Sequence, residues 1–158
     1  MLPVTILTGF LGCGKTTLIR RLLASPWGRR IGILLNERGV AGIDDVGPTE
    51  SGFVELAEGC VCCVDQPDLV DALRQLTTIK DLDRILLETT GLADPLPISW
   101  TVARPDLADL VTLEAVITVV DAATWEQAQS SEEWRAQVEC ADVVILSKLD
   151  LVDAPAAE

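Results

Sequence analysis

The chain has 158 residues, 49% of them hydrophobic, so its composition excludes a disordered protein and fits one folded domain. Twenty-five acidic against twelve basic residues give a net charge of −13, which disfavours partners such as nucleic acid or an anionic membrane. No apolar run reaches membrane-spanning length and no signal-peptide pattern is present, so we expect a cytoplasmic protein. Five cysteines in that compartment favour metal-binding or buried thiols over disulfides, and histidine is absent.

Short apolar runs alternate with helical patterns along the chain. The predicted strands are 4–8, 31–35, 53–56, 84–88, 115–120 and 143–146. The predicted helices are 15–25, 67–78, one or two short ones within 98–110, and 124–140, with a proline-bounded turn at 92–97. This alternation predicts an α/β fold with a doubly wound, mostly parallel sheet. Ligands bind such sheets beyond the carboxyl ends of the strands, where the polar motifs of this chain fall.

The first of these motifs is a glycine-rich stretch at 9–16, between the first strand and the first helix. It matches G-x-x-x-x-G-K-[ST], whose backbone N–H groups surround nucleotide phosphates, and it predicts a P-loop NTPase. We expect Lys15 to reach the β- and γ-phosphates and Thr16 to ligate Mg²⁺. An ordinary glycine-rich turn is the alternative, which the Lys-Thr pair and the flanking elements disfavour. The nucleotide-binding residues predicted from this motif are Gly9, Gly12, Cys13, Gly14, Lys15, Thr16 and Thr17.

The stretch 147–150, Ser-Lys-Leu-Asp, follows the last strand and indicates which base is bound. It resembles [NT]-K-x-D, in which the aspartate carboxylate accepts hydrogen bonds from the N1–H and exocyclic amine of guanine. Asp150 would take this role here, and the stem of Lys148 would cover the ring. Ser147 departs from the pattern because it replaces asparagine and removes a side-chain amide. A polar strand end without a special role is the alternative.

The stretch 88–91, Glu-Thr-Thr-Gly, ends another buried strand. P-loop GTPases carry an acidic residue and a glycine that senses the γ-phosphate at this place. Glu88 would hold a Mg²⁺-bound water or orient the attacking water, and Gly91 would contact the nucleotide. The alternative is a solvated carboxylate at a strand end.

Three cysteines lie close together in the sequence, at Cys60, Cys62 and Cys63. Their thiolates suit Zn²⁺ or another thiophilic divalent ion. A fourth tetrahedral position is left for Glu37, another acid, water or a partner protein. Buried or redox-active thiols are the alternative, because C-x-C-C is less diagnostic than paired C-x-x-C units. The two remaining cysteines, in the phosphate loop and at position 140, are expected to pack as small residues.

These motifs together resemble the CobW-like family of P-loop GTPases, relatives of the urease and hydrogenase maturation GTPases. The resemblance is carried by T-G-F-L-G-C-G-K-T-T-L, Asn36-Glu37, G-C-V-C-C, E-T-T-G-L-A-D-P and V-V-D-A. It implies a GTP- and GDP-binding, GTP-hydrolysing metallochaperone that uses Mg²⁺, carries a metal such as zinc on the three cysteines and serves a client metalloprotein. The candidate catalytic residues are Lys15, Glu88 and Glu37, the last also within a switch implied for 37–45.

Two departures from the family pattern stand out. Arg38 and Val40 occupy places where family members usually carry an aromatic residue and an acid, which leaves the fourth metal ligand and the switch contacts open. The family's C-terminal domain is absent, so we expect 1–158 to be the GTPase domain, truncated before that domain. The long stretch 37–52 joins the two predicted sites, so metal delivery is expected to depend on the nucleotide.

Two other functions stay open from the residues themselves. The first is a P-loop NTPase or kinase that uses ATP, in which the guanine motif is accidental. The second is a metal sensor or buffer that binds nucleotide but hydrolyses it very slowly.

Overall fold

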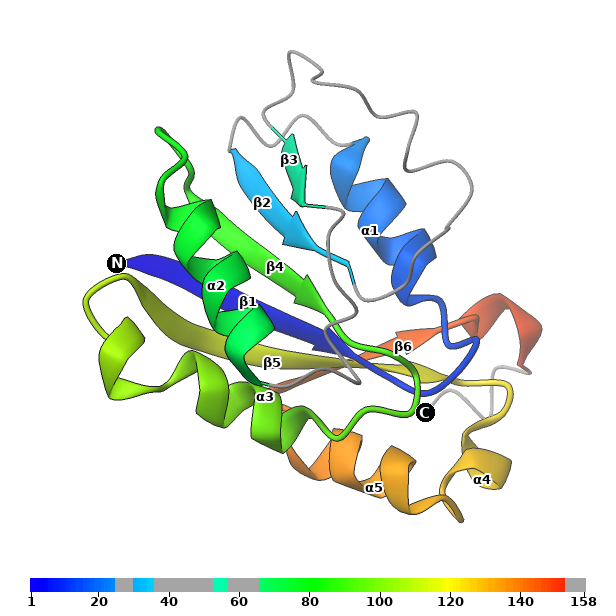
Figure 1. Cartoon of the computed structure of the whole chain (residues 1–158). Helices are drawn as coiled ribbons and strands as arrows, with labels where there is room; N and C mark the ends of the chain where they lie inside the picture. The colour runs from blue at the N-terminus through cyan, green and yellow to red at the C-terminus, as the bar shows by residue number, and fades with distance from the viewer. Residues whose placement is uncertain (25–29, 36–52, 57–65, 153–158) are drawn as a thin grey trace.

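A parallel β-sheet forms the centre of the molecule. The computed structural model describes residues 1–24, 30–35, 53–56 and 66–152. The described strands form a six-stranded sheet in the order β3-β2-β4-β1-β5-β6, with every pairing parallel (Figure 1). They are β1 (Leu2–Thr8), β2 (Ile31–Leu34), β3 (Phe53–Leu56), β4 (Arg84–Glu88), β5 (Val111–Asp121) and β6 (Val143–Ser147). All six predicted strands are confirmed, although β5 begins at Val111 rather than at 115 because Val111 pairs with Leu2.

Helices connect the strands. They are α1 (Lys15–Leu23), α2 (Gln66–Thr77), α3 (Pro95–Val102), α4 (Trp125–Ala128) and α5 (Glu132–Glu139), with 3-10 turns η1 (Pro105–Leu107) and η2 (Leu149–Leu151). Within the described part of the chain, no helix has the length and apolarity needed to cross a membrane.

Two predictions about helices are wrong. The proline-bounded turn at 92–97 instead contains the start of α3, because the Asp94 carboxylate accepts the N–H of Leu96 and proline suits the first helical turn. The helix expected at 124–140 is divided into α4 and α5, because Ser131 caps a new helix by accepting the N–H of Trp134.

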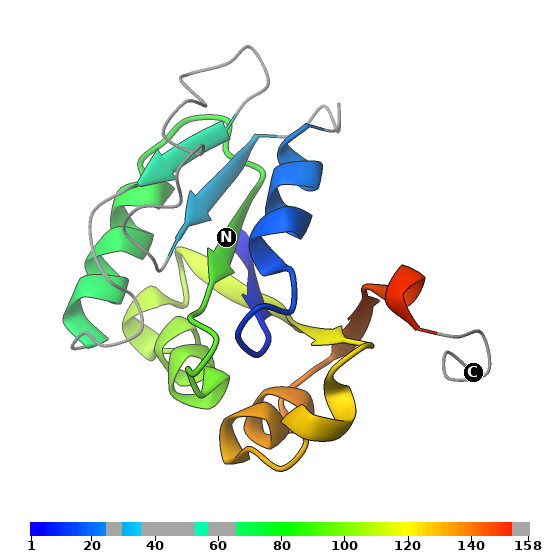
Figure 2. The same cartoon turned by 90° about the vertical axis from the view of Figure 1, so that its right-hand side faces the viewer.

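The helices cover both faces of the sheet, as expected for a doubly wound fold. Helix α1 lies on one face, and α2, α3 and α5 lie on the other (Figure 2). Alternate strand residues build the two cores: Leu7 and Leu86 pack with Ile19 of α1, whereas Ile6 and Leu87 belong to the cluster containing α2 and α3. The central strands are therefore apolar on both sides, which explains their continuous hydrophobic runs.

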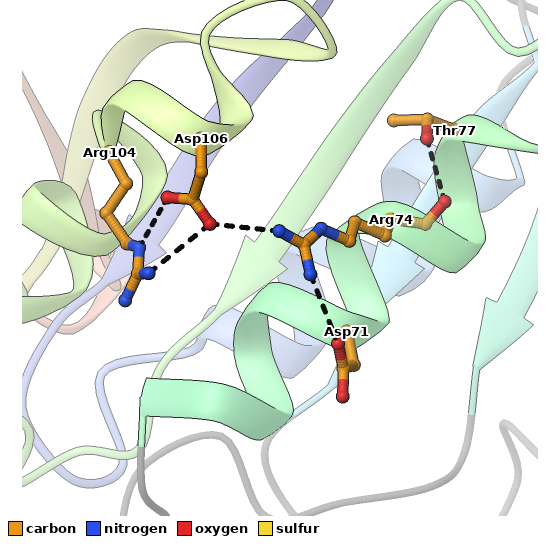
Figure 3. Close-up of polar contacts among 5 residues, drawn as sticks. All are labelled: Asp71, Arg74, Thr77, Arg104 and Asp106. Atoms are coloured by element: carbon orange, nitrogen blue, oxygen red, sulfur yellow. Dashed lines mark hydrogen bonds and ion pairs between the residues drawn. The ribbon is translucent and has the colours of Figure 1, made fainter.

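A surface network of charged groups joins α2 to η1 (Figure 3). Asp106 accepts hydrogen bonds from Arg104 Nε at 2.8 Å and from Arg74 Nη2 at 2.9 Å, and Arg74 also lies 3.7 Å from Asp71. The hydrogen bond from Arg104 lowers the pKa of Asp106. Because exposed ion pairs contribute little free energy, the network orients η1 against α2, and the apolar cores supply most of the stability.

The carboxyl ends of the inner strands meet at one edge of the sheet. Leu7 of β1 is in register with Glu88 of β4, Thr8 with Thr118 of β5, and Asp121 of β5 with Ser147 of β6. The register therefore brings the phosphate-loop, acidic and guanine motifs to the same edge, where parallel sheets bind ligands.

Candidate nucleotide-binding site

The phosphate loop leaves β1 and turns directly into α1. Gly14, at φ +102°, occupies a backbone conformation that side-chain-bearing residues rarely adopt, and α1 begins at the next residue. No side chain caps the helix at Gly14. The first N–H groups of α1 and the positive end of its dipole are consequently available to an anion.

Lys15 lies against its own loop. Its side chain is only 9% exposed, and Nζ donates hydrogen bonds to the carbonyl oxygens of Gly9 at 2.7 Å and Phe10 at 3.4 Å. These carbonyls hold the ammonium at the base of the loop, where it supplies a fixed positive charge. Such a preformed charge stabilises a bound phosphate without a large rearrangement of the protein.

A pocket of about 330 Å³ opens beside the loop. Its lining combines the loop and first turn of α1 with the end of β4: Leu11, Gly12, Gly14, Lys15, Thr16, Thr17, Glu88, Thr89, Thr90 and Gly91. The structure therefore brings together most of the residues predicted at the phosphate end. Gly9 and Cys13 belong to the loop but do not line the pocket; Cys13 packs instead in the apolar cluster with Ile19.

A hydroxyl and a carboxylate meet inside this pocket. Thr16 Oγ1 donates to Glu88 Oε1 at 3.4 Å, and the Glu88 side chain is 7% exposed. Mg²⁺ prefers oxygen ligands and is held in phosphate sites by few protein groups together with water and phosphate. The donor set at Thr16 and Glu88 fits that ion.

Gly91 approaches the phosphate loop closely. A Cβ atom at this position would lie 2.6 Å from Leu11 Cδ2 and 2.7 Å from the Leu11 backbone nitrogen. Only glycine fits here without displacing the loop. The segment after β4 and the phosphate loop are thus in direct contact.

The predicted guanine motif lies at the end of β6. Ser147 donates through Oγ to the carbonyl oxygen of Cys13 at 2.6 Å and to that of Val120 at 3.3 Å. The residue that departs from the family pattern therefore still ties the base motif to the phosphate loop. Lys148 adopts a left-handed backbone conformation, at φ 57°, and Asp150 follows in η2 with an exposed side chain.

Asp121, at the end of β5, holds Lys148 in place. The Lys148 ammonium lies 2.6 Å from Asp121 Oδ2, and the N–H of Ala123 donates to Oδ1. Burial acts to raise the pKa of Asp121, but the hydrogen bonds from Lys148 and Ala123 outweigh it and the pKa is lowered. The sequence pattern places Asp121, within V-V-D-A, with the other polar residues at the carboxyl ends of the strands, but it does not indicate the ion pair with Lys148.

The predicted metal ligands Glu37, Cys60, Cys62 and Cys63 lie outside the described residues. Among the residues that are described, no group of three potential metal-ligating side chains occurs. The other two cysteines pack as predicted: Cys13 is buried and Cys140 half-buried against the core. Burial raises the pKa of both thiols, so both stay protonated at neutral pH.

The chain is similar to known proteins over nearly its whole length. It is 41% identical over 190 residues to the zinc chaperone CobW of Pseudomonas aeruginosa, a match that covers 98% of this chain and 51% of the relative. It is 38% identical over 166 residues to the zinc-regulated GTPase metalloprotein activator 1 of Schizosaccharomyces pombe, covering 98% and 40%. The chain thus spans about half the length of these relatives, or less.

Solved structures are similar to the chain as well. The Zn(II)-bound YjiA GTPase of Escherichia coli superposes with a TM-score of 0.71 at 34% identity, over 99% of this chain and 52% of that one. The signal recognition particle receptor FtsY of Elizabethkingia anophelis, at 18% identity and a TM-score of 0.61, covers 95% of this chain and 51% of its own and shows the fold alone. The predicted P-loop fold is confirmed. Because residues 3–158 match the CobW/HypB/UreG nucleotide-binding domain, the chain belongs to the CobW/HypB/UreG family.

Proposed function

We propose that this chain binds GTP with Mg²⁺ at the pocket beside the phosphate loop and hydrolyses it to GDP and phosphate. The observation that carries the proposal is the convergence of Lys15, Thr16, Glu88 and Gly91 on one pocket at the carboxyl edge of the sheet. A positive charge, a hydroxyl–carboxylate pair and the start of a helix are the parts that phosphoryl transfer requires. Membership of a family whose relatives include named GTPases supports the same reading.

In the reaction, water attacks the γ-phosphorus and the bond between that phosphorus and the β–γ bridging oxygen breaks. Lys15 would stabilise the charge on the β- and γ-phosphates, and the N–H groups of the loop would hold the β-phosphate. Thr16 and Glu88 would hold Mg²⁺, which would supply positive charge to stabilise the phosphates. Glu88 would orient water in the pocket, and Gly91 would contact the γ-phosphate. Glu37 remains a candidate for water positioning or metal binding.

Base selection is assigned to the end of β6. Asp150 would accept the N1–H and exocyclic amine of guanine, and the aliphatic stem of Lys148 would cover the ring. The ion pair of Lys148 with Asp121 and the hydrogen bond of Ser147 to Cys13 support this role, because they hold the motif beside the phosphate loop. Adenine offers no matching pair of donors, so GTP is preferred over ATP.

The cargo is proposed to be a thiophilic divalent metal, zinc first, bound by the thiolates of Cys60, Cys62 and Cys63. The printed names of the relatives, zinc chaperone and zinc-regulated metalloprotein activator, support this choice. A client metalloprotein in the cytoplasm would receive the metal. The nucleotide would set the metal affinity through the segment from 37 to 52, as in other GTPase switches.

Metal binding measured in two nucleotide states tests this function. Zinc affinity is titrated against a competing chelator in the presence of a non-hydrolysable GTP analogue and of GDP, and hydrolysis of GTP and ATP is measured with and without zinc. We expect the two zinc affinities to differ by about 5- to 150-fold, which corresponds to a coupling free energy of about 1–3 kcal/mol. Hydrolysis of GTP should exceed that of ATP.

The control is a cysteine outside the predicted cluster. Replacing Cys60, Cys62 and Cys63 together by serine should abolish tight zinc binding, whereas Cys140→Ser should retain it, since Cys140 packs against the core. Equal zinc affinity in the two nucleotide states would remove the coupling while leaving both sites in place. Zinc binding that survives the triple substitution would contradict the cysteine assignment.

A further inference from the structure

A buried glutamine on α5 contacts the segment that follows β4. Gln137 is 0% exposed, and its Nε2 donates to the carbonyl oxygens of Gly91 and Ala93, at 3.1 Å in each case. It does not line the nucleotide pocket, whereas Gly91 does. We propose that Gln137 is a positioning residue for GTP hydrolysis, because it holds the γ-phosphate-sensing segment, residues 90–93, against the phosphate loop. The inference rests on the function proposed above.

The segment is fixed from several sides. Its approach from β4 is anchored by hydrogen bonds to β1, from the Thr89 N–H to the Leu7 carbonyl and from the Thr89 hydroxyl to Thr8. A turn follows, in which the N–H of Ala93 donates to the Thr90 carbonyl. Gly91 then packs against Leu11 of the loop, and its carbonyl oxygen accepts the hydrogen bond from Gln137 Nε2. Residues 90–93 therefore lie between the phosphate loop and α5.

The direction of these hydrogen bonds matters for a phosphate ligand. Because Nε2 binds the Gly91 carbonyl oxygen, that partial negative charge is turned toward α5. A carbonyl turned instead toward the pocket would repel the γ-phosphate, and its rotation would also move the neighbouring peptide groups. The amide of Gln137 therefore keeps the segment in an orientation compatible with a triphosphate.

The choice of glutamine at this position is itself informative. Gln137 Oε1 is buried and has no hydrogen-bond partner among the described residues. An unpaired buried acceptor is destabilising, and a side chain such as Met or Leu would fill the space without it. Reversing the amide would place Oε1 against two carbonyl oxygens, which excludes that orientation. What glutamine adds over an apolar residue is the pair of hydrogen bonds to residues 91 and 93.

The position of Gln137 also joins the two ends of the proposed site. The Thr118 hydroxyl of β5 donates to the backbone carbonyl of Gln137 at 2.7 Å, which fixes α5 to the sheet. Past the end of α5, the N–H of Asp142 donates to Val116, and β6 then leads into the guanine motif. One short stretch, 137–150, thus holds the phosphate-sensing segment at its beginning and carries the base-reading residues at its end.

The test is Gln137→Met, which keeps the side-chain length and removes both donors. With GTP and Mg²⁺ we expect kcat to fall about tenfold, as for a small misplacement of reacting groups. The affinity for a non-hydrolysable GTP analogue should fall while that for GDP stays within about twofold, because GDP lacks the γ-phosphate. Amide hydrogen exchange at residues 90–93 of the nucleotide-free protein should become faster. Thermal stability should change little, because removal of the unpaired acceptor offsets the loss of the two hydrogen bonds.

Thr118→Val is the matched control. It removes the hydrogen bond to the backbone of Gln137 but leaves the side-chain amide in place, so kcat should remain near the wild-type value. Equal losses of kcat in the two variants would overturn the inference in favour of a general loosening of α5. Unchanged kcat, nucleotide affinities and exchange in Gln137→Met would also overturn it.

Two further outcomes separate this inference from its premise. If Met prevents folding, Gln137→Asn makes the same test, because its shorter side chain cannot reach both carbonyls. Wild-type protein that binds neither GTP nor GDP would contradict the proposed nucleotide site. Wild-type protein that hydrolyses GTP, together with an unaffected Gln137 variant, would contradict the role of Gln137 alone.

Discussion

The proposed nucleotide site has a phosphate end, formed by residues 9–17 and 88–91, and a base end for guanine, formed by residues 147–150. The two ends are built in different ways. The phosphate end lies over the central strands β1 and β4, where Lys15 is 9% and Glu88 7% exposed. The base end follows β6, the last strand of the described sheet, where Val143 and Leu146 are each 48% exposed. Asp150 is exposed as well. One end is part of the core, and the other is attached to its edge.

This difference indicates where binding energy and selectivity should arise. Backbone dipoles and a buried ammonium at the phosphate end are fixed before the ligand arrives, so they act most strongly on charge that develops during the reaction. The base end is held by two connections to the interior, Ser147 to Cys13 and Lys148 to Asp121. Substitutions at the phosphate end should therefore alter turnover, and substitutions at the base end should alter which nucleotide binds.

The largest effect is expected at Lys15. Lys15→Ala removes the buried positive charge beside the loop and should lower kcat for GTP at least about 10²- to 10³-fold, with weaker triphosphate binding. The fold should persist, because the loop conformation depends on its glycines and on the start of α1. Steady-state GTP hydrolysis measures the fall in kcat, and circular dichroism measures whether the fold persists. Lys80→Ala, which removes an exposed lysine far from the loop in sequence, is the control and should change neither. Undiminished turnover in Lys15→Ala would remove the phosphate assignment.

A change of selectivity is expected at the base end. Asp150→Asn replaces an acceptor by a group that can donate, so GTP affinity should fall about 100-fold and xanthosine triphosphate should bind better than GTP. The kcat measured with saturating xanthosine triphosphate should stay close to the wild-type kcat with GTP, since the phosphate end is untouched. Competition binding with GTP, ATP and xanthosine triphosphate tests this. Asp109→Asn, at an exposed position outside the site, serves as the control. Wild-type protein with equal affinity for ATP and GTP would contradict the guanine assignment.

The difference between the phosphate end and the base end also explains how much of the fold and of the candidate site could be predicted from the sequence. The phosphate loop is local: its glycines, Lys15 and Thr16 are close together in the chain, and in the structure Gly12, Gly14, Lys15 and Thr16 line one pocket. The central strands were also predictable, because burial on both faces leaves continuous apolar runs in β1 and β4. The start of α3 was missed because a carboxylate cap at Asp94 overrode the turn signal of two prolines.

The residues that support the site depend instead on tertiary contacts. The amide of Gln137 reaches Gly91 across 46 positions, and Lys148 reaches Asp121 across 27. No spacing pattern in one sequence indicates such pairs, because parallel strands bring together residues that are far apart in the chain. A buried glutamine on a short helix also looks, in the sequence, like any polar residue of an exposed helix face. Candidate binding groups could therefore be named from local motifs, whereas the tertiary contacts that hold them could not.

The smallest effect is expected at Asp121, which connects the base end to the interior. Asp121→Asn keeps an oxygen acceptor for the N–H of Ala123 but loses the ion pair with Lys148, a partly exposed pair worth about 1 kcal/mol. Affinity for both GTP and GDP should fall about fivefold, while kcat stays unchanged.

The pH dependence distinguishes this ion pair from simple packing. The pKa of Asp121 is lowered below its ordinary value of 3.8 in the folded protein, so its contribution to stability is complete above that value and is lost as the pH falls through the lowered pKa. The difference in free energy of unfolding between wild type and Asp121→Asn should thus be constant from pH 7 to about 5 and shrink in stronger acid. Chemical denaturation at a series of pH values measures it, with Asp109→Asn as the control. A difference that is independent of pH down to 3, or an unchanged nucleotide affinity, would show that Lys148 does not depend on Asp121.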